Sequence, residues 1–371
     1  MIFGIPMEIR DNEYRVGAVP FLVEELVKRG HQVLVETNAG DKSHHSDGDY
    51  ENSGAVIVPS PEKLYGQSEH ILKVRSPKPV EYDLIKPHHT VFAFFNFFNH
   101  LEMTRSLMAR GCSCFAYELL KTKENIRPIL NMDRAIAGQL AVQQGAYFLE
   151  CQNGGRGVLI GEALGVSPAR VVVIGANAAG VAAANYAARS GASVHLLDED
   201  PALLESIREK LPANVNTLIN HEQNLKKILP ATDLLISATQ QVENKTYEII
   251  SEAAVKTLPE GAVIIDLDIE NGGSIATCTP TKFENPTFVK HGVIHYCVPN
   301  LPGAVPASAS EALSSALLPY VLRFIDTTPT SVFQEDGEFR SGLVVFEGRI
   351  VNEALAKELD VQYYDIKEHR A

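Results

Sequence analysis

The stretch 169–198 constrains the fold of this chain more than any other feature of its sequence. An apolar run, 171–174, leads into the turn Gly175-Ala-Asn-Ala-Ala-Gly180, and a helix rich in small residues follows. A second apolar run then ends at Asp198, about 20 residues further on. This order of strand, glycine turn, helix, strand and acidic residue is typical of a dinucleotide-binding βαβ unit.

The glycine turn predicts a contact with a pyrophosphate. Backbone N–H groups at the start of a helix bind phosphate, and the residues concerned are Gly175, Asn177, Ala178, Ala179 and Gly180. Asp198 is expected to bind the adenosine ribose, which favours NAD over NADP because a 2′-phosphate would be repelled. We therefore predict NAD as the cofactor.

One position of the turn departs from the usual G-x-G-x-x-G pattern. Its second glycine, which lets the backbone approach the pyrophosphate closely, is replaced by Asn177. Asparagine tolerates left-handed dihedral angles better than most residues, but it carries a side chain. The alternative is therefore a domain of this fold that has lost or weakened its nucleotide.

Composition limits the classes of function. The 371 residues are 45% hydrophobic and 21% charged, which is globular and enough for two domains. A net charge of −13 argues against nucleic acid and anionic membranes. No apolar run approaches the roughly 18 residues of a membrane span. The N-terminus does not resemble a signal peptide, and five scattered cysteines suggest a reduced, cytoplasmic protein without a metal site.

Strands and helices are expected to alternate along the chain. The expected strands are 1–6, 32–36, 71–74, 90–95 and 113–117 before the glycine turn, and 215–219, 234–237 and 262–269 after it. The expected helices are 20–29, 101–109, 133–149 and 308–324. A hairpin of 343–346 with 349–351, followed by a small helix from Asn352, ends the pattern. The alternation predicts α/β architecture with parallel sheets covered on both faces.

Several ordered segments carry a family resemblance. They are Gly4-Ile-Pro-Met-Glu-Ile-Arg-Asp-Asn-Glu-Tyr-Arg-Val16, Arg29-Gly-His-Gln-Val-Leu-Val-Glu36, Leu72-Lys-Val-Arg75, Gly154-Gly-Arg-Gly-Val-Leu159, 171–180, Asn271-Gly-Gly273 and Tyr296-Cys-Val-Pro-Asn-Leu-Pro-Gly-Ala-Val-Pro306. In these segments the chain resembles the family of alanine dehydrogenase and the NAD-binding subunit of pyridine-nucleotide transhydrogenase, over essentially its whole length.

The resemblance implies two doubly wound Rossmann-like domains. A discontinuous substrate domain, 1–127 and 308–371, would contain an inserted NAD-binding domain, 128–307, with the site in the cleft between them. The implied activity is an NAD-dependent amino-acid dehydrogenase or imine reductase. It would transfer hydride between nicotinamide and the α-carbon of an amino acid or 2-oxo acid. Homo-oligomers, dimers or hexamers, are also implied.

Four candidate catalytic residues follow from the resemblance. Arg15 matches the arginine that binds the substrate carboxylate, a task suited to a planar guanidinium. The family's lysine falls on Arg75, its histidine on Asn96 and its aspartate on Glu270. Asn96 has no titratable proton, so it cannot replace a general acid or base, a loss of about 10²–10⁴-fold in rate. Arg75 stays protonated and can bind an anion or polarise a carbonyl.

Further positions are expected to contact the cofactor. Asp133 and Arg134 fall on a Met-Ser pair of the family, and Asn300 is retained. The remaining expected contacts are Ser237, Ala238, Asp268 and Val298. Asp133, Asp268 and Glu270 could supply a replacement base if one of them has a raised pKa.

The substitutions predict a respecialised enzyme. Arg15, Arg75 and Arg134 together would suit a substrate with more than one anionic group, such as a dicarboxylic or bulkier amino acid or an imine adduct. Three alternatives remain open. One is a non-redox enzyme of a specialised pathway, with lyase, condensing or transferase chemistry. Another is a catalytically dead binding or regulatory homologue, and the third is ordinary alanine dehydrogenase activity by the altered residues.

Overall fold

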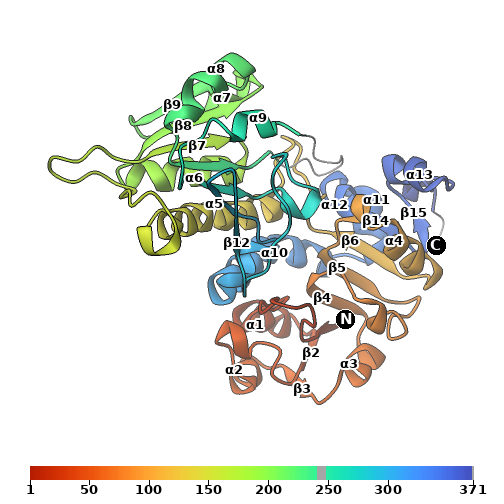
Figure 1. Cartoon of the computed structure of the whole chain (residues 1–371). Coiled ribbons are helices and arrows are strands. Elements are labelled where there is room, and N and C mark those ends of the chain that lie inside the picture. The colour runs from red at the N-terminus through yellow and green to blue at the C-terminus, as the bar shows by residue number, and fades with distance from the viewer. Residues whose placement is uncertain (240–247, 370–371) are drawn as a thin grey trace. The chain divides into compact units, whose positions relative to one another are not determined.

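The computed structural model describes residues 1–239 and 248–369, which form two compact units (Figure 1). The first unit comprises Met1–Asp133 and Gly303–Ala371, and the second comprises Arg134–Pro302. Each unit is a sheet covered by helices, so the predicted pair of Rossmann-like α/β domains is confirmed. No helix among the described residues is long and apolar enough to cross a bilayer.

The first unit is built on an eight-stranded sheet with the order β15-β14-β6-β5-β4-β1-β2-β3. Its strands are β1 (Ile2–Ile5), β2 (Gln32–Glu36), β3 (Val56–Val58), β4 (His70–Arg75), β5 (Thr90–Phe94), β6 (Ser113–Ala116), β14 (Leu343–Phe346) and β15 (Arg349–Ile350). Strands β1 to β6 are parallel, whereas β14 runs antiparallel to β6 and forms the predicted hairpin with β15. The sheet is therefore mixed at one edge. Strands β2 and β3 are added on one side of β1 and strands β4 to β6 on the other, so the strand order reverses between β1 and β4. That position is the switch point, where ligands bind in such sheets.

The helices of the first unit are α1 (Pro20–Lys28), α2 (Asp47–Asn52), α3 (Pro61–Gln67), α4 (Leu101–Ala109), α10 (Pro306–Ile325), α11 (Pro329–Glu335), α12 (Gly337–Gly342) and α13 (Glu353–Leu359). Of these, α1, α4, α10 and α13 match predicted segments, whereas α2, α3, α11 and α12 were not predicted. Asn352 caps α13 by accepting a hydrogen bond from Leu355 N, as a helix starting there requires. In Figure 1 α13 lies at the C-terminal end of the chain, close to β15.

The second unit is built on a seven-stranded sheet with the order β12-β13-β11-β10-β7-β8-β9. Its strands are β7 (Arg170–Ile174), β8 (Ser193–Asp198), β9 (Val215–Ile219), β10 (Leu234–Ser237), β11 (Val263–Asp266), β12 (Thr287–Lys290) and β13 (Val293–Tyr296). All pairs are parallel except β12 with β13. The switch point lies between β7 and β10, and the glycine turn follows β7 at this position.

The prediction of a strand over 262–269 is wrong for its last three residues. Strand β11 stops at Asp266, and the chain turns into the short 3-10 helix η6 (Ile269–Asn271). The reason is the Asp266 side chain, which accepts hydrogen bonds from Asp268 N at 2.9 Å and Ser274 N at 3.0 Å and so closes a turn. Aspartate favours such local side-chain to backbone bonds over strand pairing.

Helices of the second unit include one that begins in the first. They are α6 (Ala178–Arg189), α7 (Pro201–Arg208), α8 (Glu222–Ile228), α9 (Glu252–Val255) and α5 (Pro128–Phe148), which starts at Pro128, before the predicted residue 133. A Cβ on Gly138 of α5 would collide with the carbonyl oxygen of Ala179 on α6. The glycine therefore allows these two helices to approach closely.

Candidate functional site

The glycines of the turn 175–180 are required by close backbone packing. Gly175 has a φ of +99°, and a Cβ there would collide with the carbonyl oxygen of Ala238, the residue that follows β10. A Cβ on Gly180 would collide with the carbonyl oxygen of Gly175. The turn therefore lies against β10 at the switch point, where a Rossmann domain binds its dinucleotide.

Asn177 is the N-cap of α6. Its side-chain Oδ1 accepts hydrogen bonds from Ala179 N at 2.9 Å and Gly180 N at 3.3 Å, and its Nδ2 donates to the carbonyl oxygen of Ala238. Its φ of −76° lies in the ordinary extended region. The tolerance of asparagine for left-handed angles is therefore not needed here, and the side chain acts through its hydrogen bonds.

Asp198 lies at the end of β8, beside the turn. Its Oδ2 accepts a hydrogen bond from Ala176 N at 2.7 Å, and its Oδ1 accepts one from Asp200 N at 3.0 Å. Two backbone donors thus hold a half-buried carboxylate next to the glycine turn. This is the position expected for a ribose ligand.

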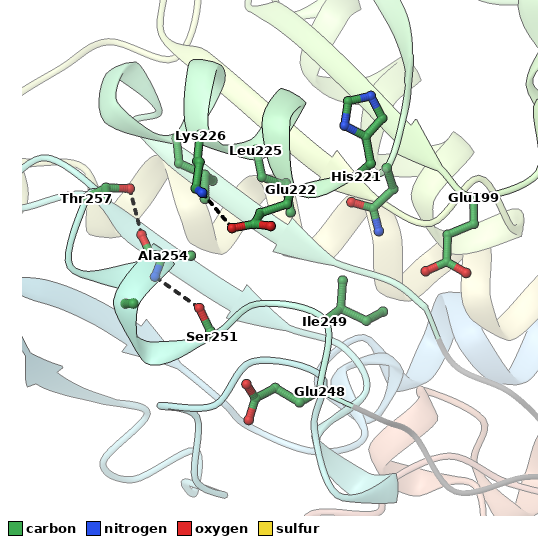
Figure 2. Close-up of a pocket in the computed structure, with 13 residues that line it drawn as sticks. Glu199, His221, Glu222, Leu225, Lys226, Glu248, Ile249, Ser251, Ala254 and Thr257 are labelled. Atoms are coloured by element: carbon green, nitrogen blue, oxygen red, sulfur yellow. Dashed lines mark hydrogen bonds and ion pairs between the residues drawn. The ribbon is translucent and has the colours of Figure 1, made fainter.

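A cavity of about 470 Å³ lies in the second unit, beside the residues that follow β8 and β9 (Figure 2). Apolar side chains of Leu225, Leu229 and Ile249 form part of its lining, together with polar residues that include Glu199, Asn220, His221 and Glu248. Glu199 and Asn220 directly follow β8 and β9. The volume is in the usual range for a small-molecule site.

Two buried carboxyl groups, Asp266 and Asp268, lie at the end of β11 and just after it. Asp268 is fully buried, and its Oδ2 accepts hydrogen bonds from Ser237 Oγ at 3.2 Å, Thr239 N at 2.7 Å and Thr239 Oγ1 at 2.7 Å. Among the described residues, its other oxygen is buried without a hydrogen-bond partner. Burial, together with the charge of Asp268, raises the pKa of Asp266 to about 7.

The other residues predicted for the site in the second unit are the cofactor contacts Ala238, Val298, Asn300 and Arg134 and the catalytic candidate Glu270. Ala238 and Val298 are buried. Asn300 has a φ of +58°, a left-handed conformation that asparagine adopts more readily than most residues. Glu270 lies in η6, and Arg134 lies on α5.

Arg15 in the first unit is buried and already bound by two carboxylates. Its Nε and Nη2 donate to the two oxygens of Glu13 at 2.7 and 2.6 Å, and its Nη1 donates to Asp133 Oδ1 at 2.7 Å. Burial acts to lower the pKa of Arg15, but the charges of Glu13 and Asp133 outweigh it and the pKa is raised. Glu13 has a side-chain exposure of 1% and Asp133 one of 23%, so Asp133 is the more accessible partner.

The loop that carries Arg15 is anchored to α10. Val16 N donates to Ser310 Oγ at 3.0 Å, and Val19 N donates to Ser314 Oγ at 3.0 Å. A Cβ on Gly17 would collide with the carbonyl oxygen of Leu72 on β4. These contacts fix Arg15 beside the switch point between β1 and β4.

Arg75 ends β4, and its backbone is held by a buried acid. Glu8 Oε1 accepts hydrogen bonds from Val74 N at 2.7 Å and Arg75 N at 3.3 Å. Glu8 Oε2 lies 3.4 Å from the buried ammonium of Lys73. Burial and the charge of Arg15 lower the pKa of Arg75 from its ordinary value. Two arginines thus share this edge of the sheet, which suits an anionic ligand.

Asn96 follows β5 in a left-handed conformation, with a φ of +55°. The buried carboxyl group of Glu118 accepts hydrogen bonds from Asn96 N at 2.7 Å and Phe95 N at 3.2 Å. Burial raises the pKa of Glu118 against these hydrogen bonds. Asn96 itself is half-buried and accepts a hydrogen bond from Asn99 Nδ2 at 3.0 Å.

The predicted residues are divided between the two units. Arg15, Arg75, Asn96 and Asp133 belong to the first unit, whereas the glycine turn, Asp198, Ser237, Ala238 and Asp268 belong to the second. Sequence reasoning missed the supporting acids Glu13, Glu118 and Asp266, together with Thr239. Glu13 lies two residues before Arg15, a spacing that could have indicated an ion pair, whereas the other three have no such local signal.

Comparison with known proteins covers both units. The family model "Alanine dehydrogenase/PNT, N-terminal domain" matches residues 4–137, and "Alanine dehydrogenase/PNT, C-terminal domain" matches residues 141–353. The chain is 37% identical over 365 residues to "Alanine dehydrogenase" of Mycolicibacterium smegmatis, with 98% of each chain covered. It is 35% identical over 369 residues to "Alanine dehydrogenase 2" of Staphylococcus aureus strain Mu50, with 99% of each covered.

Solved structures give the same result. A structure titled "L-alanine dehydrogenase" aligns with a TM-score of 0.91 at 35% identity, covering 97% of this chain and 100% of the other. A transhydrogenase from Sinorhizobium meliloti aligns with a TM-score of 0.80 at 24% identity, over 95% of this chain and 100% of its own, which shows a shared fold. The chain therefore belongs to the alanine dehydrogenase/PNT family.

Proposed function

We propose that this protein is an NAD-dependent amino-acid dehydrogenase or imine reductase whose substrate differs from alanine. The observation that carries the proposal is the glycine turn at the switch point of the second unit, with Asp198 bound to it. Relatives named alanine dehydrogenase over nearly the whole chain support this class of reaction. The cofactor would supply the hydride chemistry, and the protein would supply geometry and charge.

The second unit has features that suit a dinucleotide. The N-terminus of α6 would bind the pyrophosphate through backbone N–H groups, and Asp198 would bind the adenosine ribose. The cavity beside Asp198 and Asn220 would hold the adenine, because its volume of about 470 Å³ and its partly apolar lining fit a flat heterocycle. The nicotinamide part of the dinucleotide would bind at the ends of β10, β11 and β13, where Ser237, Ala238, Asp268, Val298 and Asn300 lie.

The first unit would bind the substrate. Arg15 and Arg75 would hold the substrate carboxylate and polarise its carbonyl or imine group. Asn96 would orient the substrate without transferring a proton. Asp133, Asp268 and Glu270 are the candidates for a replacement base. Arg15 and Arg75 together, with Arg134, favour a substrate with a second anionic group.

A specific observation favours a second candidate, a regulatory homologue without turnover. All three nitrogen positions of the Arg15 guanidinium already donate to Glu13 or Asp133. A substrate carboxylate would have to share or displace one of these acids. Asp133 is the one to be displaced, because it is the more exposed of the two.

Calorimetric titration with NADH, with NADPH as the comparison, tests the proposal. We expect micromolar binding of NADH and weaker binding of NADPH. A panel of 2-oxo acids, each with ammonia or an amine, should then reveal NADH consumption with at least one substrate. Failure of the folded protein to bind NADH would exclude the dehydrogenase. NADH binding without turnover over a broad panel would favour the regulatory candidate or the non-redox enzyme.

A further inference from the structure

The side chain of Asn177 spans the switch point of the second unit. On one side its Oδ1 accepts hydrogen bonds from Ala179 N and Gly180 N, the second and third residues of α6. On the other side its Nδ2 donates to the carbonyl oxygen of Ala238, which follows β10. The amide group is thus held at both ends, between the start of a helix and the end of a neighbouring strand.

These N–H groups belong to the part of a Rossmann turn that faces a pyrophosphate. The first N–H groups of a helix have no partner within it and bind whichever acceptor lies nearby. In α6, a helix of 12 residues, two of them already bind Asn177. A phosphate oxygen that approached the same donors would compete with the amide oxygen.

The backbone at this position does not require asparagine. A φ of −76° and a ψ of −176° are extended angles that any residue adopts. The neighbouring glycines, by contrast, are required because a Cβ on Gly175 or Gly180 would collide with backbone. The choice of side chain at 177 therefore affects what occupies the helix start and leaves the path of the turn unchanged.

We propose that Asn177 is an internal plug of the pyrophosphate site, whose amide must rotate away from the start of α6 before the cofactor can bind. This inference rests on the proposed function. It makes Asn177 a determinant of cofactor affinity, because the hydrogen bonds to Ala179 N and Ala238 O are lost each time a dinucleotide enters. The protein therefore binds the cofactor less tightly than it would with a glycine at this position.

Two substitutions separate the plug from the helix cap. Asn177→Gly removes the competing oxygen, and glycine is a nearly equivalent N-cap. We expect NADH to bind about 3- to 10-fold more tightly, the change equivalent to the net value of one hydrogen bond. Asn177→Asp keeps the shape and the cap but sets a negative charge against the pyrophosphate. We expect it to weaken NADH binding at least about tenfold.

Two smaller ligands, ADP and adenosine, test whether the change in affinity arises at the pyrophosphate. Isothermal titration with NADH and with ADP, which also has a pyrophosphate, should show the gain in Asn177→Gly. Adenosine, measured by competition, should bind equally to both proteins. The matched control is Asn352→Gly, which removes the same side chain from the cap of α13 in the first unit. It should leave NADH affinity unchanged, and the melting temperature nearly so.

The outcomes are distinct for the inference and for the proposed function. If the wild type binds NADH and Asn177→Gly has the same or a lower affinity, the plug is overturned while the dehydrogenase stands. The same holds if Asn177→Asp binds NADH as tightly as the wild type does. A gain shared by adenosine also overturns it. Binding by Asn177→Gly with none by the wild type would support the plug and would exclude an NAD-dependent reaction of the wild type. If none of the stably folded proteins binds NADH, both fail.

Discussion

Arg15 and Asp133 are 118 residues apart in sequence and form an ion pair, with Arg15 Nη1 2.7 Å from Asp133 Oδ1. Glu13 binds the other side of the same guanidinium. The hydrogen bonds to Glu13 and Asp133 use three of the five N–H groups of this guanidinium. An anionic substrate would therefore bind beside these carboxylates, and their negative charges would oppose its binding.

Removing the arginine should destabilise the first unit. Arg15→Gln would leave the Glu13 carboxylate buried without its partner, at a cost of about 3–5 kcal/mol. Denaturant unfolding should show this loss in the free energy of unfolding. Arg15→Gln with Glu13→Gln should recover part of it, because no buried charge would remain unpaired. Equal stability of Arg15→Gln and the wild type would contradict the ion pair.

Neutralising the other acid should improve substrate binding. Asp133→Asn can still accept the hydrogen bond from Arg15, but it removes the negative charge that competes with a substrate carboxylate. We expect the KM for an accepted 2-oxo acid to fall about tenfold. A loss of kcat of about 10²-fold or more in the same variant would identify Asp133 as the replacement base. A rise in KM would instead show that Asp133 binds a cationic group of the substrate.

Restoring a titratable group after β5 should change the rate. Asn96→His places an imidazole on a left-handed backbone that histidine tolerates. General acid–base groups contribute about 10²–10⁴-fold, so we expect kcat for reductive amination to rise at least about tenfold and to gain a titration near the ordinary histidine pKa of about 6.5. Asn96→Ala is the control and should show neither effect. An unchanged, pH-independent rate in Asn96→His would place residue 96 away from the reacting atoms.

Asp198 should determine the choice of dinucleotide. Asp198→Ala removes the carboxylate that would repel a 2′-phosphate. We expect the ratio of NADPH to NADH affinity to rise at least about tenfold, mainly through lost NADH binding. Calorimetry with both nucleotides measures it. Asp200→Ala, which changes the neighbouring exposed cap of α7, is the control. An unaltered ratio in Asp198→Ala would remove Asp198 from the ribose site.

The Asp266–Asp268 pair predicts a pH dependence of stability. Because the folded-state pKa of Asp266 is about 7, above its usual 3.8, the native state holds a proton that the unfolded state releases. This contribution is present below about pH 4 and is lost as the pH rises to about 7, at about 1.4 kcal/mol per pH unit. Asp268→Asn removes the neighbouring charge and should lower the pKa of Asp266. The free energy of unfolding of this variant should therefore fall less between pH 5 and 7 than that of the wild type.

Chemical unfolding at several pH values tests this prediction. Other buried acids, such as Glu8 and Glu118, also have raised pKa values, so the comparison of the variant with the wild type isolates the pair. Asp200→Asn, an exposed carboxylate, should behave as the wild type does. Parallel pH profiles for Asp268→Asn and the wild type would show that the two carboxyl groups do not interact.

Local sequence pattern was sufficient for the elements that form from their own neighbours. The order of β7, turn, α6 and β8 could be predicted because apolar spacing, glycines and Asp198 all lie within one stretch. Helices α1 and α4 followed from their apolar spacing and their flanking glycines in the same way. Strands β3 and β12 were missed because they are partly exposed edge strands, and β12 has no continuous apolar run. Strand β13 was missed because the buried His295 interrupts its apolar run.

The contacts of the candidate site depended on the tertiary structure. Asp133 meets Arg15, Glu118 holds Asn96 N, and Asp268 holds Thr239 N across separations of 118, 22 and 29 residues. No local pattern encodes such pairs, because hydrogen bonds and charges act over a few ångströms whatever the sequence separation. The sequence by itself determined which residue types were available and which elements carry them. The packing of parallel strands decided which side chains meet, since it brings the ends of distant strands to one edge of a sheet.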